Sequence, residues 1–167
     1  AVGRTMIQVL TEKQFPYTEL RLLASARSAG TTMTVAGRDI AVELATPEAF
    51  EGIDIAIFSA GGATSAELAP EAAKRGCVVV DNSSAWRMDP QVPLVVSEVN
   101  PHALERIGKG IVANPNCTTM AAMPVLAPLH AEAGLRRLVI SSYQAVSGSG
   151  LAGVEELAGQ IRAAVAQ

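Results

Sequence analysis

The sequence predicts an α/β fold in which a doubly wound, mostly parallel sheet carries helices on both faces. Residues 53–60 (IDIAIFSA) and 77–81 (CVVVD) are near-continuous apolar runs, the pattern of parallel strands that are buried on both sides. Such runs alternate along the chain with segments of helical periodicity, and glycine or polar turn residues separate them. Repeated alternation of strand and helix is typical of an open parallel sheet.

The composition bounds the class of protein. The 167 residues are 49% hydrophobic and 17% charged, which is ordinary for a globular chain with one core. The net charge is −3 and basic residues form no run, so we expect a small-molecule partner and neither nucleic acid nor a membrane surface. No apolar stretch approaches the ~20 residues of a membrane span, and no signal-peptide pattern opens the chain, so we expect a cytoplasmic protein. The cysteines and histidines lack metal-ligand spacing, so no metal site is expected.

The N-terminal segment suggests part of a dinucleotide site. Residues 2–12 (VGRTMIQVLTE) have the spacing of an amphipathic helix, and Ala1, Val2 and Gly3 stand at its start. In a dinucleotide-binding unit, a glycine-rich turn leads into a helix whose N-terminus receives the pyrophosphate. A single glycine before a helix is a weak signal by itself.

A second cofactor contact is expected after the next strand. Residues 19–26 (ELRLLASA) predict that strand, and Arg27 and Ser28 follow its carboxyl end. An acidic residue at this place suits the ribose 2′-hydroxyl of NAD, whereas a basic residue suits the 2′-phosphate of NADP. The alternative is a solvated arginine on a loop.

The remaining elements follow from turn and capping signals. Asn100 and Pro101 have the order of an N-cap and a first helical residue, and prolines at 124 and 128 interrupt a helical segment. In chain order we expect an edge hairpin (31–44, turning at 37–38), a helix (64–75), a strand (94–99), a helix (100–107), a strand (110–114), a kinked or divided helix from 118, a strand (136–146), a polar turn (147–150) and a final helix (151–166).

Cys117 is the principal candidate for chemistry. The run 111–119 (IVANPNCTT) predicts a strand, a turn at Asn114 and Pro115, and a helix that begins beside Cys117. Free N–H groups and the helix dipole at that end favour an anion, so they would favour the thiolate and stabilise an oxyanion nearby. The alternative is a small cysteine that only packs in the core, as we expect of Cys77.

Arg87 is the second candidate. It lies in the polar loop 82–87 (NSSAWR), which directly follows the apolar strand 77–81. A guanidinium offers a fork of donors that suits a phosphate or a carboxylate. The alternative is a surface arginine whose aliphatic stem covers Trp86.

Two runs, NPNCTTMAAMP (114–124) and SSYQAVSGSGLAG (141–153), carry a resemblance to the aspartate-β-semialdehyde dehydrogenase family, and the similarity extends over most of the chain. It implies a Rossmann-like NADP domain over residues 1–116 and the start of a catalytic and dimerisation domain over 117–167. It also implies that the family's first strand and first glycines are absent here, so that the sequence represents part of a longer homodimeric or homotetrameric enzyme.

The resemblance implies a reaction and roles for single residues. NADPH would reduce aspartyl phosphate to the semialdehyde, with release of phosphate, in lysine, diaminopimelate, threonine and methionine biosynthesis. Cys117 would form a thioester, Arg87 and Asn116 would bind phosphate, and Gln144 would hold the acyl group. The cofactor contacts implied or suggested are Ala1, Val2, Gly3, Arg27, Ser28, Ser147 and Gly148.

Other interpretations stay open. The family's acid/base histidine and carboxylate-binding arginine have no counterpart here, and neither His102 nor His130 suits Cys117 as a base, so this chain alone is expected to be inactive. N-acetyl-glutamyl-phosphate reductase shares the chemistry but tends to carry glycine before its cysteine, where Asn116 stands here. A non-catalytic nucleotide-binding module is the third possibility.

Overall fold

A computed structural model describes residues 2–166, with the backbone only at Leu151. The chain divides into two compact units, residues 1–128 and 129–167, and each is described by itself. Within the described residues, no helix is both long enough and apolar enough to cross a membrane.

The first sheet of unit 1 holds β1 (Leu22–Ala24), β3 (Arg38–Leu44) and β2 (Thr32–Val35) in that spatial order, β1 parallel and β2 antiparallel to β3. The expected hairpin is therefore confirmed. Its turn is Ala36-Gly37, one residue earlier than predicted, and both residues have positive φ (48° and 78°). Positive φ at both central residues is the geometry whose twist matches a two-residue hairpin.

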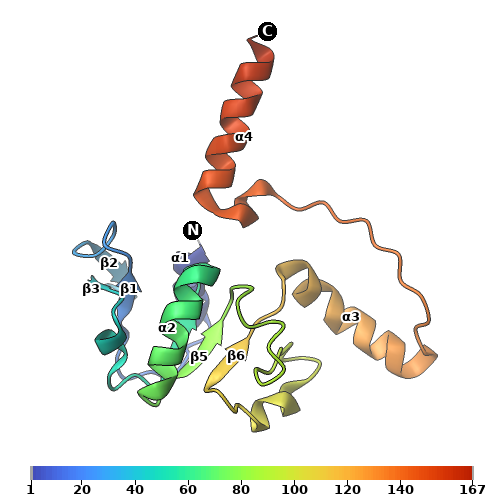
Figure 1. Cartoon of the computed structure of the whole chain (residues 1–167), viewed down its shortest axis with the longest axis horizontal. Helices are drawn as coiled ribbons and strands as arrows, with labels where there is room; N and C mark the ends of the chain where they lie inside the picture. Colours follow the sequence, from blue (N-terminus) through green and yellow to red (C-terminus); the bar gives the residue numbers. More distant parts are fainter. Residues whose placement is uncertain (1, 167) are drawn as a thin grey trace. The chain divides into compact units, whose positions relative to one another are not determined.

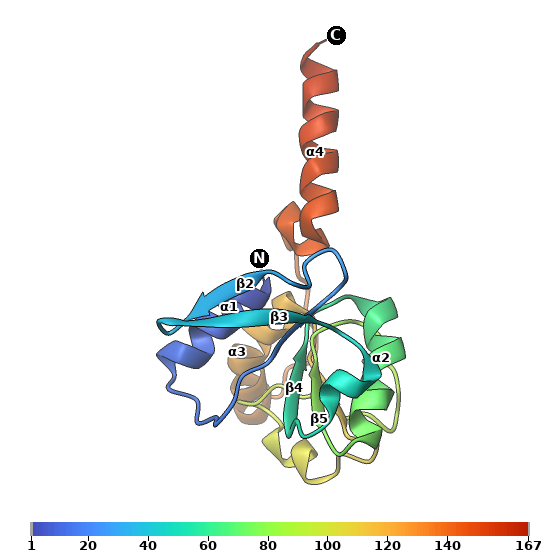
Figure 2. The same ribbon diagram turned by 90° about the vertical axis from the view of Figure 1, so that its left-hand side faces the viewer.

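Helix α1 (Val2–Glu12) covers the first sheet, as Figure 2 shows beneath β2. Its Ile7 packs against a small apolar cluster that contains Leu22, Val35 and Val42. No described residue of α1 is buried, so this helix rests on one face only.

The second sheet is fully parallel, and its order is β4 (Ile55–Phe58), β5 (Val78–Asp81) and β6 (Ile111–Ala113). Helix α2 (Gly62–Lys74) packs on it (Figure 1). The main core lies between them, because parallel strands bury both faces under crossover helices. Its buried members are Phe50, Phe58, Leu68, Ala69, Ala72, Cys77, Val79, Val92, Ile111 and Ala113.

The two sheets are separate, although Leu23 and Ala45 of the first pack against the core of the second. Strand β4 forms an edge of its sheet, and its Ile55 and Ile57 are 52% and 45% exposed. A hollow of about 300 Å³ lies between α1 and Ile57. An uncovered apolar edge on a parallel strand is surface that a further strand or another chain could cover.

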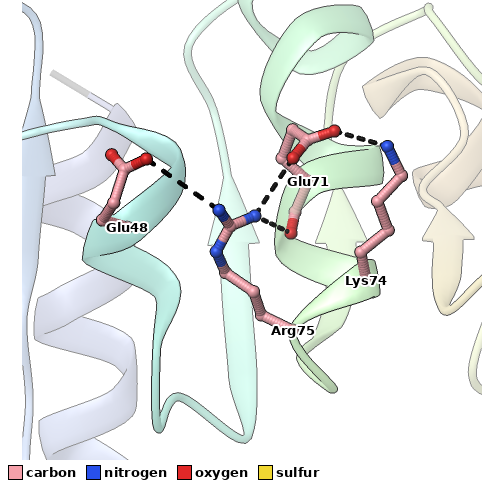
Figure 3. Close-up of polar contacts among 4 residues, drawn as sticks. All are labelled: Glu48, Glu71, Lys74 and Arg75. Carbon is pink, nitrogen blue, oxygen red and sulfur yellow. Dashed lines mark hydrogen bonds and ion pairs between the residues drawn. The ribbon is translucent and has the colours of Figure 1, made fainter.

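One ion pair joins the end of α2 to the short 3₁₀ helix η1 (Pro47–Phe50), and two more lie along α2, as Figure 3 shows. Arg75 at the end of α2 contacts Glu71 at 3.1 Å and Glu48 at 3.9 Å, and Lys74 donates to Glu71 at 2.6 Å. A basic side chain at a helix C-terminus also complements the helix dipole.

Two predicted strands are wrong. In 94–99, only Leu94 makes a bridge, to Ala113. The segment then turns because Asn100 Oδ1 accepts the Val96 N–H and Asn100 Nδ2 donates to the Leu94 carbonyl, so backbone groups that a strand would pair are already used. Segment 136–146 is extended, but no described strand pairs with it.

Two helix predictions also need correction. The expected helix at 100–107 is a shorter 3₁₀ helix, η2 (Pro101–Glu105), because the side chain of Asn100 bonds backward and does not cap it. Helix α3 (Cys117–Ala133) is one continuous element that contains both prolines, so of the two expected forms, kinked or divided, the divided one is wrong.

Unit 2 contains the extended segment, a 3₁₀ helix η3 (Val146–Ser149) and helix α4 (Gly150–Val165). No described side chain from 129 to 166 is buried. Apolar residues of α4 recur at helical spacing and are 38% to 81% exposed, namely Val154, Leu157, Ile161 and Val165.

Candidate functional site

Three polar loops meet at the carboxyl edge of the second sheet. Because β4, β5 and β6 are parallel, the loops that follow them lie at the same edge, where open α/β sheets bind ligands. The loop after β4 ends at Gly61, the loop after β5 contains Asn82 to Arg87, and the loop after β6 spans Asn114 to Asn116 and leads to Cys117.

Asn116 caps helix α3 and makes Cys117 its first residue. The Asn116 carbonyl accepts the Met120 N–H at 2.9 Å, and its Oδ1 accepts the Thr118 N–H at 3.0 Å and the Thr118 hydroxyl at 2.5 Å. This is the N-cap arrangement, in which a side-chain oxygen satisfies a free donor of the first turn. The position predicted for Cys117 is therefore confirmed.

The two cysteines have opposite environments. Cys117 is exposed, and its Sγ lies 3.9 Å from Asn116 Oδ1. Cys77 is 1% exposed, and burial raises the pKa of its thiol. The alternative that Cys117 merely packs in the core is excluded by its exposure, whereas that interpretation holds for Cys77.

Arg87 is half-buried and held against the ends of two strands. Its Nε donates to the Asn114 carbonyl at 2.9 Å, and its Nη2 donates to the Asn82 carbonyl at 3.3 Å. The guanidinium thus lies on the loop that leads to Cys117. Its remaining N–H groups are available for an anion.

Trp86 and Arg87 make different polar contacts. The indole N–H of Trp86 donates to Ser65 Oγ at 3.0 Å, and Lys109 Nζ lies 6.0 Å from the centre of its ring. Trp86 therefore anchors the loop to α2 while Arg87 turns toward the strand ends.

Two asparagines hold this arrangement, and neither was predicted to do so. Asn114 Nδ2 donates to Asn82 Oδ1 at 2.8 Å. A signal was present, because each asparagine directly follows an apolar strand, in VVVDN and IVAN. Polar residues that close adjacent parallel strands meet at one edge of the sheet.

The predicted cofactor residues of unit 1 lie at turns. Val2 opens helix α1, and the space where a side chain at Gly3 would project holds no atom within 4 Å, so a ligand has room there. Arg27 is exposed and Ser28 half-buried in the turn after β1. Ala1 lies outside the described residues. A separate hollow of about 520 Å³ between α1 and β2 has none of these residues in its lining.

In unit 2, Gln144, Ser147 and Gly148 belong to one short stretch around η3. A Cβ atom at Gly148 would stand 2.5 Å from Gln144 Nε2, so the carboxamide lies directly over this glycine. The Gly148 N–H donates to the Ala145 carbonyl at 3.1 Å. A side chain at position 148 would displace the amide of Gln144.

Comparison with known families identifies this arrangement. Residues 1–107 match the family described as "Semialdehyde dehydrogenase, NAD binding domain". The chain belongs to the semialdehyde dehydrogenase family. Residues 126–167 match the dimerisation domain of semialdehyde dehydrogenases, and Cys117 falls between the two matches. The first match supports a nicotinamide dinucleotide as cofactor.

Similar members of the semialdehyde dehydrogenase family carry one name. The aspartate-semialdehyde dehydrogenase of Streptomyces akiyoshiensis is 64% identical over 99% of this chain and 48% of its own length. Aspartate semialdehyde dehydrogenase II of Vibrio cholerae, complexed with ASA, is 46% identical with a TM-score of 0.89 over 95% of this chain and 48% of that one. The aspartate semialdehyde dehydrogenase of Candida albicans, with NADP, is 26% identical. It matches with a TM-score of 0.65 over 81% of this chain and 45% of its own. The chain therefore spans about half the length of these relatives.

Proposed function

We propose that this chain is the NADP-binding and nucleophile-bearing part of an aspartate-semialdehyde dehydrogenase. The observation that carries the proposal is the geometry of Cys117, an exposed cysteine that begins a capped helix beside the Arg87 loop. The names of its relatives favour the aspartyl substrate over an N-acetyl-glutamyl one. The product is an amino-acid precursor, aspartate semialdehyde.

Cys117 acts as the nucleophile. Its sulfur attacks the acyl carbon of aspartyl phosphate, an S–C bond forms, and the C–O bond to phosphate breaks. The first-turn N–H groups of α3 stabilise the oxyanion of the tetrahedral intermediate. A nicotinamide dinucleotide, when bound, would supply the hydride equivalent needed to reduce the Cys117 thioester. Collapse then releases the aldehyde and returns the electron pair of the S–C bond to Cys117 as thiolate.

Arg87 and Asn116 receive the leaving phosphate. The guanidinium is prepositioned by its two carbonyl contacts and directs its other N–H groups to the anion. Because Asn116 Oδ1 is engaged in capping, the Nδ2 group of this amide is the part suited to phosphate. Gln144 holds the acyl group through its carboxamide.

NADP is the cofactor that the turn after β1 favours. Arg27 is positively charged and exposed, which suits a 2′-phosphate, and the helix start at Val2 and Gly3 suits the pyrophosphate, with Ala1 preceding it in the sequence. Ser147 and Gly148 are proposed as further cofactor contacts.

The domain boundary is proposed at residues 116 and 117, so that residues 1–116 bind the cofactor and 117–167 begin the catalytic and dimerisation domain. The exposed apolar residues of α4 support homo-oligomer formation, because they are surface that a subunit contact would bury. The acid/base histidine and the arginine that binds the substrate carboxylate are proposed to come from the part of the relatives' length that this chain does not span.

The proposal is tested by phosphate-dependent reduction of NADP with aspartate semialdehyde, measured on this chain and on a version extended to the relatives' length. Activity is expected in the extended protein, and Cys117→Ser should lower kcat by about 10³-fold or more, because serine is a far weaker nucleophile. Arg27→Ala should raise KM for NADP but not for NAD. Retention of full activity in Cys117→Ser would show that another group forms the covalent intermediate, or that none does.

A further inference from the structure

Asn82 and Asn114 occupy one row of the second sheet. Asp81 and Ala113 are register partners in β5 and β6, so the two asparagines are the next positions along the same pair of strands. The Asn114 N–H donates to the Asp81 carbonyl at 2.8 Å, and the side-chain amides bond to each other at 2.8 Å. One backbone and one side-chain hydrogen bond therefore join the strand ends.

Arg87 depends on this junction. Its guanidinium donates to the carbonyl oxygens of the same two residues, Asn82 and Asn114. The separation and direction of those oxygens decide where the guanidinium points. A change in the relative position of the strand ends would therefore redirect the N–H groups that remain for an anion.

The Asn82 side of the junction is anchored independently. The Asn82 N–H donates to the Phe58 carbonyl at 2.9 Å. Beside it, the hydroxyl of buried Ser83 donates to the carboxylate of fully buried Asp81 at 2.6 Å and accepts the Ala85 N–H at 3.1 Å. The amide–amide bond thus ties the loop that leads to Cys117 onto an already fixed support.

We propose that Asn82 and Asn114 are positioning residues for oxyanion binding, and that they act through their mutual amide hydrogen bond on the Arg87 guanidinium. This inference rests on the proposed function, in which Arg87 receives phosphate. The ligand class is a tetrahedral oxyanion, either inorganic phosphate or the phosphoryl group of an acyl phosphate. Both asparagines act without touching the ligand.

The test uses the 167-residue chain with inorganic phosphate as the probe, observed at the Arg87 Nε–H resonance by NMR. Asn82→Ala and Asn114→Ala should each weaken phosphate binding by about 5- to 10-fold and speed solvent exchange of that proton. The double variant should be no weaker than either single one, because all three lose the same bond. Asn100→Ala is the matched control, since it also removes side-chain bonds to loop backbone but contacts neither carbonyl.

A second comparison keeps the test decisive if the alanine variants unfold. Asn82→Asp retains an acceptor for Asn114 Nδ2 and should keep the Arg87 proton protected, whereas Asn82→Leu, of similar size, should not. Equal protection in these two variants, or additive losses in the double alanine variant, would overturn the positioning role. If Arg87→Ala leaves phosphate binding unchanged, the proposed function of Arg87 fails. Loss of binding in Arg87→Ala with unchanged asparagine variants would reject the positioning role alone.

Discussion

Unit 1 and unit 2 differ in how many of their apolar side chains are buried by contacts within the same unit. Unit 1 encloses a core in which Val79 is 0% and Ile111 is 1% exposed. In unit 2, Val139 and Tyr143 are 77% and 99% exposed, and α4 leaves an apolar face uncovered. Buried apolar area is the main stabilising term in folding, so unit 1 has the means to fold alone while unit 2 requires a covering surface.

A second contrast lies inside unit 1. The core behind β5 and β6 is apolar, whereas the carboxyl edge of the same strands carries a bonded polar network around Arg87 and Cys117. The packed core holds the strands rigidly, and the polar side chains at the edge are the ones proposed to bind ligand and react. Side chains for binding are held well when the elements beneath them are packed.

The largest expected effect tests the contrast between the units. Ile111→Ala should lower the free energy of unfolding by about 2–5 kcal/mol, because it opens a cavity in the core of unit 1. Ile161→Ala in α4 should change it by less than about 0.5 kcal/mol, because Ile161 is 53% exposed. Urea unfolding of the whole chain measures both variants. A cost above about 1 kcal/mol for Ile161→Ala would mean that α4 is covered in solution and that the contrast is wrong.

The next effect tests the contrast between core and edge. At pH 7, one equivalent of iodoacetamide should label Cys117 at least ~10-fold faster than Cys77, because only the thiolate reacts and Cys77 is buried with a raised pKa. Peptide mapping by mass spectrometry gives the ratio. Cys117→Ser should leave the chain nearly unlabelled under native conditions, and comparable labelling of both thiols would sink the idea of an accessible nucleophile.

The sequence predicted the elements whose signals are local. The helix at 2–12, the hairpin, the buried strands and the position of Cys117 were found because periodicity, turn residues and capping act within a few residues. That the family's first strand is absent here is an implication of the family resemblance, and it stays a prediction.

The wrong strand predictions arose where a contact with a residue outside the local pattern determines the structure. Segment 136–146 has strand composition, but a strand exists only when another strand pairs with it, and the described residues provide none. In 94–99, the side chain of Asn100 competes for the backbone groups. The hydrogen bond between the side-chain amides of Asn82 and Asn114 joins residues 32 positions apart, so only the register of β5 and β6 reveals it.

The smallest effect concerns pH and again separates the units. Lys74 and then Arg75 hold the pKa of Glu71 below its usual range, and Lys109 does the same for Asp89 (Figure 3 shows the Glu71 contacts). A lowered folded-state pKa contributes stability that is present above the unfolded value, about 4 for a carboxyl group, and that is lost as pH falls through the folded value.

The urea midpoint should therefore be nearly constant from pH 7 to about 5 and should fall at more acidic pH. Glu71→Gln should lower the midpoint at pH 7 and flatten its acid dependence, because the group that must be protonated is gone. Glu156→Gln in α4 is the matched control, since Glu156 is exposed and accepts only a hydrogen bond from Gln160 at 3.0 Å among the described contacts. If Glu156→Gln flattened the curve as much as Glu71→Gln, the acid sensitivity would belong to the whole surface and not to the ion pairs of Glu71 with Lys74 and Arg75.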